Sequence, residues 1–138
     1  MTRFDLMPGD WVTLTDLCVN VKVDCLSREY VYYGWLNGRN EASEYDVVMP
    51  LLITEKVLRS NFFELVEVGD HGVATPAQHR DRYEKWIRKT KWKDIIIWYD
   101  RRTKKYNLHD MNGAKFQYIH ELQHALRLAG IDIEFNPL

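Results

Sequence analysis

The sequence predicts an α+β fold in a single domain, residues 1–138, with a β-rich part at 1–53 and a mixed part at 54–138. Short segments that alternate apolar and polar residues, separated by turn residues, fill the first fifty positions. The run DIIIWYD at 94–100 is typical of a buried strand, and 116–130 repeats apolar residues at helical spacing. A chain of this length buries roughly two thirds of its unfolded surface, so it needs no disulfide or metal to fold.

The N-terminal part is expected to form a bent antiparallel sheet or an SH3-like barrel, because short strand signals follow one another with tight turns between them. Pro8-Gly9-Asp10 is a turn signal that leads into a strand at 11–14. Residues 19–23 alternate valine with polar side chains, as a half-buried strand does. Further strands are predicted at 30–36 and 45–49.

A short connecting helix is predicted after Thr54, whose hydroxyl can accept a hydrogen bond from a backbone N–H of the first turn. Glu55 in that turn complements the helix dipole, and Val57 and Leu58 are expected to face inward. The alternating segment 63–68 predicts another strand.

The segment Thr75-Pro76-Ala77-Gln78 resembles a capping box with proline at the first helical position, so a helix is predicted from 76 to 89. A strand at 82–89 is the alternative. A hairpin is predicted to follow, in which 94–100 pairs with a strand that begins at 105, across the turn 101–104.

A C-terminal helix is predicted over 116–130 and is expected to cover this hairpin. Gly130 supplies the left-handed cap that ends it. Residues 131–135 alternate apolar and acidic side chains and predict a final edge strand. The residues of the helix that recur at helical spacing, and should be buried, are Ile119, Leu122, Leu126 and Ala129.

Composition and charge narrow the function classes. No apolar run approaches the ~20 residues of a membrane helix, and the first residues hold no apolar signal region, which predicts a cytoplasmic protein without membrane contact. Cys18 and Cys25 are too few for a disulfide framework and are expected to be buried thiols. The formal net charge of -1 divides into -6 for residues 1–70 and +5 for residues 71–138. Two halves of complementary charge explain this better than the strongly basic footprint of a nucleic-acid binder.

Three motifs carry a resemblance to a known family. They are PGDWV at 8–12, PLLITEKVL at 50–58 and YIHELQHALRL at 118–128. With them the chain resembles a family of short uncharacterised proteins of Bacteroidetes genomes and their prophages or mobile elements, although 69–93 matches little of it. Where that family has a glycine before an aromatic residue, this chain has Ser60-Asn61-Phe62-Phe63. The resemblance implies fold and origin and leaves the function open.

The C-terminal helix contains a formal match to H-E-x-x-H, in which His120 and His124 would bind zinc and Glu121 would activate water. The sequence offers no evident third ligand. A helical wheel places both histidines with Arg127 opposite the apolar stripe, which predicts a surface open to solvent or to a partner. We therefore expect no metal, no cofactor and no catalytic residue, and a minimal zinc hydrolase built on these residues is the second alternative.

A basic stretch interleaved with tryptophan is the other candidate site. Lys and Arg can neutralise phosphates, and exposed aromatic rings can stack on bases. Tryptophans at such positions are nevertheless more often core residues. The stretch contains Arg80, Arg82, Lys85, Trp86, Arg88, Lys89, Lys91, Trp92 and Lys93, and the turn that follows contributes Arg101, Arg102, Lys104 and Lys105.

The leading hypothesis is a non-enzymatic interaction module of prophage or mobile-element origin. It would contact an unknown protein partner through the polar face of the C-terminal helix or through an exposed sheet edge. Nucleic-acid binding through Arg101, Arg102, Lys104 and Lys105 is the first alternative. The oligomeric state is left open.

Overall fold

The computed structural model describes residues 1–34, 41–69, 82–109 and 115–137 and confirms the predicted α+β fold, with two antiparallel sheets and few helices. The chain groups into two compact units, each with one five-stranded sheet. The first boundary, after Leu52, adjoins the division between the β-rich and mixed parts of the sequence. Unit 1 comprises 1–52, 118–124 and 137, and unit 2 comprises 53–117, 125–136 and 138.

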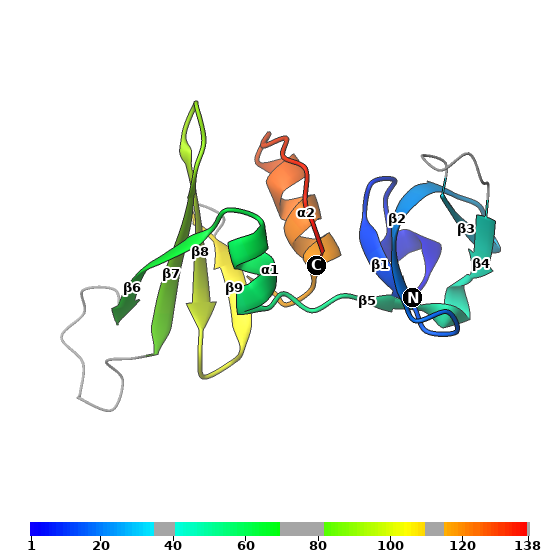
Figure 1. Ribbon diagram of the computed structural model, residues 1–138, viewed down its shortest axis with the longest axis horizontal. Helices are drawn as coiled ribbons and strands as arrows, with labels where there is room; N and C mark the ends of the chain where they lie inside the picture. Colours follow the sequence, from blue (N-terminus) through cyan, green and yellow to red (C-terminus); the bar gives the residue numbers. More distant parts are fainter. Residues whose placement is uncertain (35–40, 70–81, 110–114, 138) are drawn as a thin grey trace. The chain divides into compact units, whose positions relative to one another are not determined.

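The sheet of unit 1 has the order β4-β3-β2-β1-β5 (Figure 1). Its strands are β1 (Trp11–Leu14), β2 (Val19–Leu26), β3 (Tyr30–Tyr33), β4 (Glu41–Glu44) and β5 (Val48–Pro50). The first half of β2 pairs with β1 and its second half with β3, with a register shift between Val23 and Cys25 that bends the sheet. The bent sheet was predicted correctly, and in the described residues it does not close into a barrel.

The core of unit 1 follows the predicted alternation. Val12 and Leu14 of β1 are fully buried, while their neighbours along the strand are partly exposed. The strand predicted at 45–49 is displaced, because Tyr45–Val47 forms a 3-10 helix (η3) before β5 begins. Both cysteines are exposed, so the expectation of buried thiols was wrong. The core cluster consists of Leu6, Val12, Leu14, Val23, Val31, Tyr33 and Val48.

The sheet of unit 2 has the order β10-β9-β8-β7-β6. Its strands are β6 (Glu64–Gly69), β7 (Tyr83–Lys89), β8 (Asp94–Asp100), β9 (Lys105–Leu108) and β10 (Lys115–Phe116). The predicted hairpin is present, because Ile97–Asp100 of β8 pair with β9 in antiparallel register. One face of the sheet is buried through alternate residues, which include Trp86, Ile95, Ile97, Tyr106 and Leu108.

The helix predicted over 76–89 is wrong for its described part. Residues 83–89 form β7, which was the alternative, and residues 76–81 lie outside the described part of the chain. β7 pairs with β6 on one side and with β8 on the other. Hydrogen bonding on both edges favours the strand over the helical signal of the preceding proline.

Helix α1 (Glu55–Ser60) begins and ends as its sequence requires. The Thr54 hydroxyl accepts a hydrogen bond from the Val57 N–H at 3.2 Å, which confirms the predicted N-cap. At the other end Phe62 N–H donates to the Arg59 carbonyl and Phe63 N–H to the Leu58 carbonyl, a Schellman motif. Phe62 occupies its left-handed position with φ 66°.

The edge strand predicted over 131–135 is absent, because the segment pairs with no strand. The residue that follows this segment is held by a side chain of unit 2. Asn61, which is 2% exposed, donates to the Asn136 carbonyl at 2.6 Å and accepts from the Asn136 N–H at 2.6 Å. This amide also donates to the Val57 carbonyl at 2.8 Å, so it ties the chain end to α1.

Helix α2 (Ile119–Leu128) is shorter than predicted, and its apolar stripe is confirmed except at Ala129, which is half-buried and follows the helix. Ile119, Leu122 and Leu126 are 0–2% exposed, and Gly130 has the expected positive φ of 73°. Residues up to His124 group with unit 1, and those from Ala125 group with unit 2. None of the helices in the described ranges is both long and apolar enough to span a bilayer.

Candidate functional site

The histidines of the H-E-x-x-H match lie against a buried aspartate of unit 1. His124 Nε2 is 2.7 Å from Oδ2 of Asp10, a residue with no exposed surface. The same carboxylate oxygen accepts the Met7 N–H at 2.7 Å. The ring of His120 is 5.7 Å from that of His124 and is stacked on Tyr118 at 6.0 Å.

The polar face of α2 is partly buried, so the prediction of an open surface was wrong for its first turns. His120 is 7% exposed and Gln123 is 9% exposed, whereas Arg127 is exposed. Gln123 accepts the Trp11 N–H at 3.0 Å and donates to the Gly9 carbonyl at 2.9 Å. Gln123 therefore holds the turn that opens β1.

The arrangement does not fit a zinc peptidase. His124 directs Nε2 to Asp10, and Glu121 accepts the Tyr118 N–H at 3.2 Å, so the presumed base is engaged at the start of its own helix. Burial lowers the pKa of His120, and its Nδ1 has no hydrogen-bond partner. Among the residues that the structure describes, no group of three or more His, Cys, Asp or Glu side chains is placed to hold a metal.

The predicted basic residues of the β8–β9 turn lie together, but acidic neighbours engage part of this turn. Arg101, Arg102, Lys104 and Lys105 are all exposed. Arg101 donates through Nε to Oε2 of Glu84 at 2.8 Å, and Arg102 donates its backbone N–H to Asp100 at 3.0 Å. Arg82 pairs with Asp100 at 2.9 Å, and this hydrogen bond helps to lower the Asp100 pKa.

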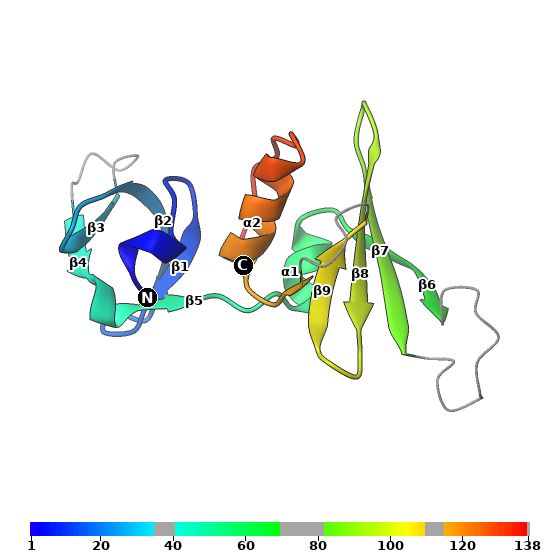
Figure 2. The same cartoon turned by 180° about the vertical axis from the view of Figure 1, so that it is seen from behind.

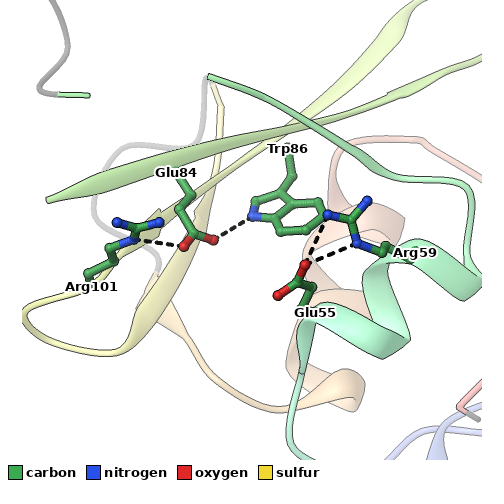
Figure 3. Close-up of polar contacts among 5 residues, drawn as sticks. All are labelled: Glu55, Arg59, Glu84, Trp86 and Arg101. Carbon is green, nitrogen blue, oxygen red and sulfur yellow. Dashed lines mark hydrogen bonds and ion pairs between the residues drawn. The ribbon is translucent and has the colours of Figure 1, made fainter. Parts of the chain in front are cut away.

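Figure 3 shows why Arg101 is held in this position. Glu84 accepts the indole N–H of Trp86 at 2.9 Å through one oxygen and Arg101 through the other. Across the indole ring lies the guanidinium of Arg59, 5.2 Å from the ring centroid, which pairs with Glu55 at 2.9 Å. Arg101 is therefore linked to Trp86 through the carboxylate of Glu84.

The turn between β7 and β8 has a different character, and its four residues run from Thr90 to Lys93. β6 pairs no further along β7 than Ile87, so the end of this hairpin is only two strands wide. It projects beyond the rest of the unit 2 sheet (Figure 1, Figure 2). At its tip Trp92 is 88% exposed, and Lys91 lies over the indole with Nζ 5.4 Å from the ring centroid.

This turn is ordered by its own hydrogen bonds. The Thr90 N–H donates to the Lys93 carbonyl at 3.2 Å, and the Lys93 N–H donates to the Thr90 hydroxyl at 3.2 Å. That hydroxyl in turn donates to the Lys93 carbonyl. Trp92 is thus held in the open on a closed turn, with exposed Lys89, Lys91 and Lys93 beside it. We name these four residues the tryptophan tip.

The structure separates the two tryptophans that the sequence placed in one basic stretch. Trp86 is 1% exposed in the middle of β7, while Trp92 lies in the turn. Sequence reasoning expected both to be core residues, which is wrong for Trp92. The pattern Lys-Thr-Lys-Trp-Lys was a usable signal, because three lysines around one aromatic residue are typical of a solvated turn.

The two basic turns lie at opposite ends of β8 and do not form one surface. Seven residues of strand place them about 20 Å apart. Charge also divides between the units, because unit 1 has 4 Lys and Arg against 9 Asp and Glu, and unit 2 has 15 against 11. Unit 2 therefore has a formal charge of +4, which favours contact with an anion.

Comparisons with known proteins do not assign this arrangement. No family model, no curated protein and no solved structure matches the chain. The resemblance to Bacteroidetes and prophage proteins stays a prediction.

Proposed function

We propose that the protein is a non-enzymatic binding module for single-stranded nucleic acid, and that it binds through the tryptophan tip. The observation that carries the proposal is the 88% exposure of Trp92 in a turn that its own hydrogen bonds keep closed. An indole in this position has a face on which a base can stack, and stacking tolerates any base sequence.

The lysines supply the complementary electrostatic part. Lys89, Lys91 and Lys93 occupy alternate positions and are exposed, so they can contact the phosphates on either side of a stacked base. Single strands fit this turn better than a duplex, since Trp92 needs an unpaired base and bases in a duplex are already stacked. The β8–β9 turn that the sequence favoured has basic residues but no exposed aromatic ring.

Binding is tested with a fluorescent thymidine oligonucleotide of about fifteen residues, by anisotropy at several salt concentrations. If three lysines contact phosphates, affinity should fall roughly 20-fold between about 50 and 200 mM salt. Trp92→Ala should cost about 1–3 kcal/mol of binding free energy by loss of stacking. This substitution carries little folding risk, because the side chain is almost fully exposed.

A matched pair of double variants locates the site. Replacing Lys91 and Lys93 by glutamine should weaken binding and reduce the salt slope by about 1.4. Replacing Lys104 and Lys105 by glutamine removes the same charge at the other turn and should leave binding nearly unchanged. If the second pair loses affinity and the first does not, the β8–β9 turn is the binding site and the tryptophan tip is not.

A lipid surface is the competing partner for an exposed tryptophan among lysines. Sedimentation with vesicles that contain phosphatidylserine tests it directly. Trp92-dependent binding to vesicles, with no binding to the oligonucleotide, would refute nucleic-acid binding. If the affinity for the oligonucleotide changes neither with salt nor in Trp92→Ala, binding through lysine–phosphate contacts and stacking on Trp92 is refuted.

A further inference from the structure

A second, smaller basic site lies in unit 1. It is a shallow cavity of about 570 Å³ that is widely open to solvent, and its volume is within the size range of small-molecule pockets. Its walls carry two guanidinium groups and two aromatic rings, and no carboxylate. The lining residues are Met1, Thr2, Arg3, Phe4, Arg28 and Tyr45.

The two arginines are notable because unit 1 is acidic overall. Within the described part of the chain, neither Arg3 nor Arg28 forms an ion pair. The nearest carboxylate in sequence to Arg3 is Asp5, and it is turned to Thr2, whose N–H donates at 2.8 Å and whose hydroxyl donates at 3.0 Å. These hydrogen bonds lower the pKa of Asp5 and hold its carboxylate at Thr2.

Local structure positions each wall of the cavity. Arg28 lies in the β2–β3 turn, which Ser27 closes by accepting the Tyr30 N–H at 3.0 Å. The Tyr45 hydroxyl donates to the Ser27 carbonyl at 2.6 Å and so ties η3 to this turn. Arg3 acts on the Tyr45 phenol electrostatically, since its charge opposes the rise in the Tyr45 pKa that burial causes. Arg3 and Arg28 line one cavity from two segments of the chain.

Phe4 adds an apolar wall at the rim. It is 84% exposed, and the Arg3 guanidinium lies 4.8 Å from its ring centroid. An exposed phenylalanine beside two arginines offers a planar apolar surface next to a site for negative charge. A ligand that uses both has a planar ring and an anionic group a few ångströms away.

We propose that this cavity binds a mononucleotide, with the phosphate held by Arg3 and Arg28 and the base stacked on Phe4. Guanidinium groups match phosphate oxygens with paired hydrogen bonds, which lysines do not. The proposal is independent of the tryptophan tip, because the cavity and the tip belong to different units and share no residue.

The test is titration calorimetry of the full chain with adenosine monophosphate, adenosine and inorganic phosphate. The monophosphate should bind at least roughly tenfold more tightly than adenosine, since adenosine lacks the charged group. It should also bind more tightly than phosphate alone, which cannot stack. Equal affinity for adenosine and its monophosphate would overturn the phosphate site, and equal affinity for phosphate and the monophosphate would overturn the stacking on Phe4.

Variants complete the test. The double variant Arg3→Gln with Arg28→Gln should reduce the affinity for adenosine monophosphate by at least roughly tenfold. Phe4→Ala changes an exposed side chain, so it should leave folding intact and reduce the affinity for the monophosphate several-fold. Lys22→Gln removes one positive charge from the same unit outside the cavity and should change nothing. Loss of binding in Trp92→Ala instead would place the nucleotide at the tryptophan tip, and tighter binding of phosphotyrosine would overturn the choice of ligand.

Discussion

Replacing His120 by phenylalanine is expected to stabilise the protein. The His120 side chain is 7% exposed, and its Nδ1 has no hydrogen-bond partner. A buried polar atom without a partner costs about 1–3 kcal/mol. Phenylalanine retains a planar ring against Tyr118 and His124 and removes the polar atom. Part of the gain is lost in fitting a larger ring. We therefore expect the free energy of unfolding to rise by about 1 kcal/mol at pH 7.

The advantage of the variant should grow as the pH falls. Burial is the largest cause of a His120 pKa below its ordinary value of 6.5, and it is partly opposed by Asp10 and Glu121. Because the folded-state pKa is lower than the unfolded one, the unfolded chain binds a proton that the folded protein does not. The stability that the neutral His120 contributes to the wild type is therefore fully present above pH 6.5. It is lost as the pH falls from there toward the folded-state pKa.

The measurement is urea unfolding followed by circular dichroism, from pH 5 to pH 8, for the wild type and His120→Phe. His109→Gln removes a histidine from an exposed position and serves as the control for loss of an imidazole elsewhere in the chain. The reasoning is refuted if His120→Phe is less stable at every pH. A concomitant loss of one equivalent of bound zinc would show that His120 is a metal ligand.

Three further substitutions test the local structure of unit 2. Asn61→Asp should lower the free energy of unfolding by about 2–3 kcal/mol at pH 7, because a carboxylate cannot donate to Val57 or Asn136. The loss should be smaller near pH 4, where the protonated acid can donate, and equal losses at both pH values would contradict this. Phe62→Gly should be about 1 kcal/mol more stable than Phe62→Ala in thermal unfolding, since φ 66° favours glycine and both variants lose the ring. Lys104→Gly should raise the free energy of unfolding by about 0.5–1 kcal/mol, because Lys104 has φ 58°, and no gain would mean that the turn relaxes its strain elsewhere.

Local signals in the sequence predicted most of the regular elements. The N-cap at Thr54 needs only a hydroxyl and the N–H groups of the next turn, so four consecutive residues contain the whole interaction. The stripe of Ile119, Leu122 and Leu126 likewise depends on helical spacing alone, and all three are buried. Such features were predictable because each cause lies within a few residues of its effect.

Errors arose where a distant segment supplied the decisive partner. The segment 131–135 alternates as a strand does but pairs with no strand, and the amide of Asn61 binds the backbone of the next residue, Asn136, 75 positions away. Residues 83–89, predicted to continue a helix, form β7 because they pair with β6 and β8. Trp86 and Trp92 have similar sequence neighbours, and only the position of the turn made one a core residue and the other a surface residue.

By itself the sequence determined the α+β class, the strand and helix signals and the division of charge between its halves, because these depend on neighbouring residues and on composition. Only the tertiary structure decided the surroundings of His120 and His124. Asp10 contacts His124 although the two residues are 114 positions apart in the sequence. A helical wheel contains no information about which surface packs against the polar face of a helix. The exposure of Trp92 and the placing of Arg3 and Arg28 on one cavity were decided in the same way, by the arrangement of segments that local pattern does not record.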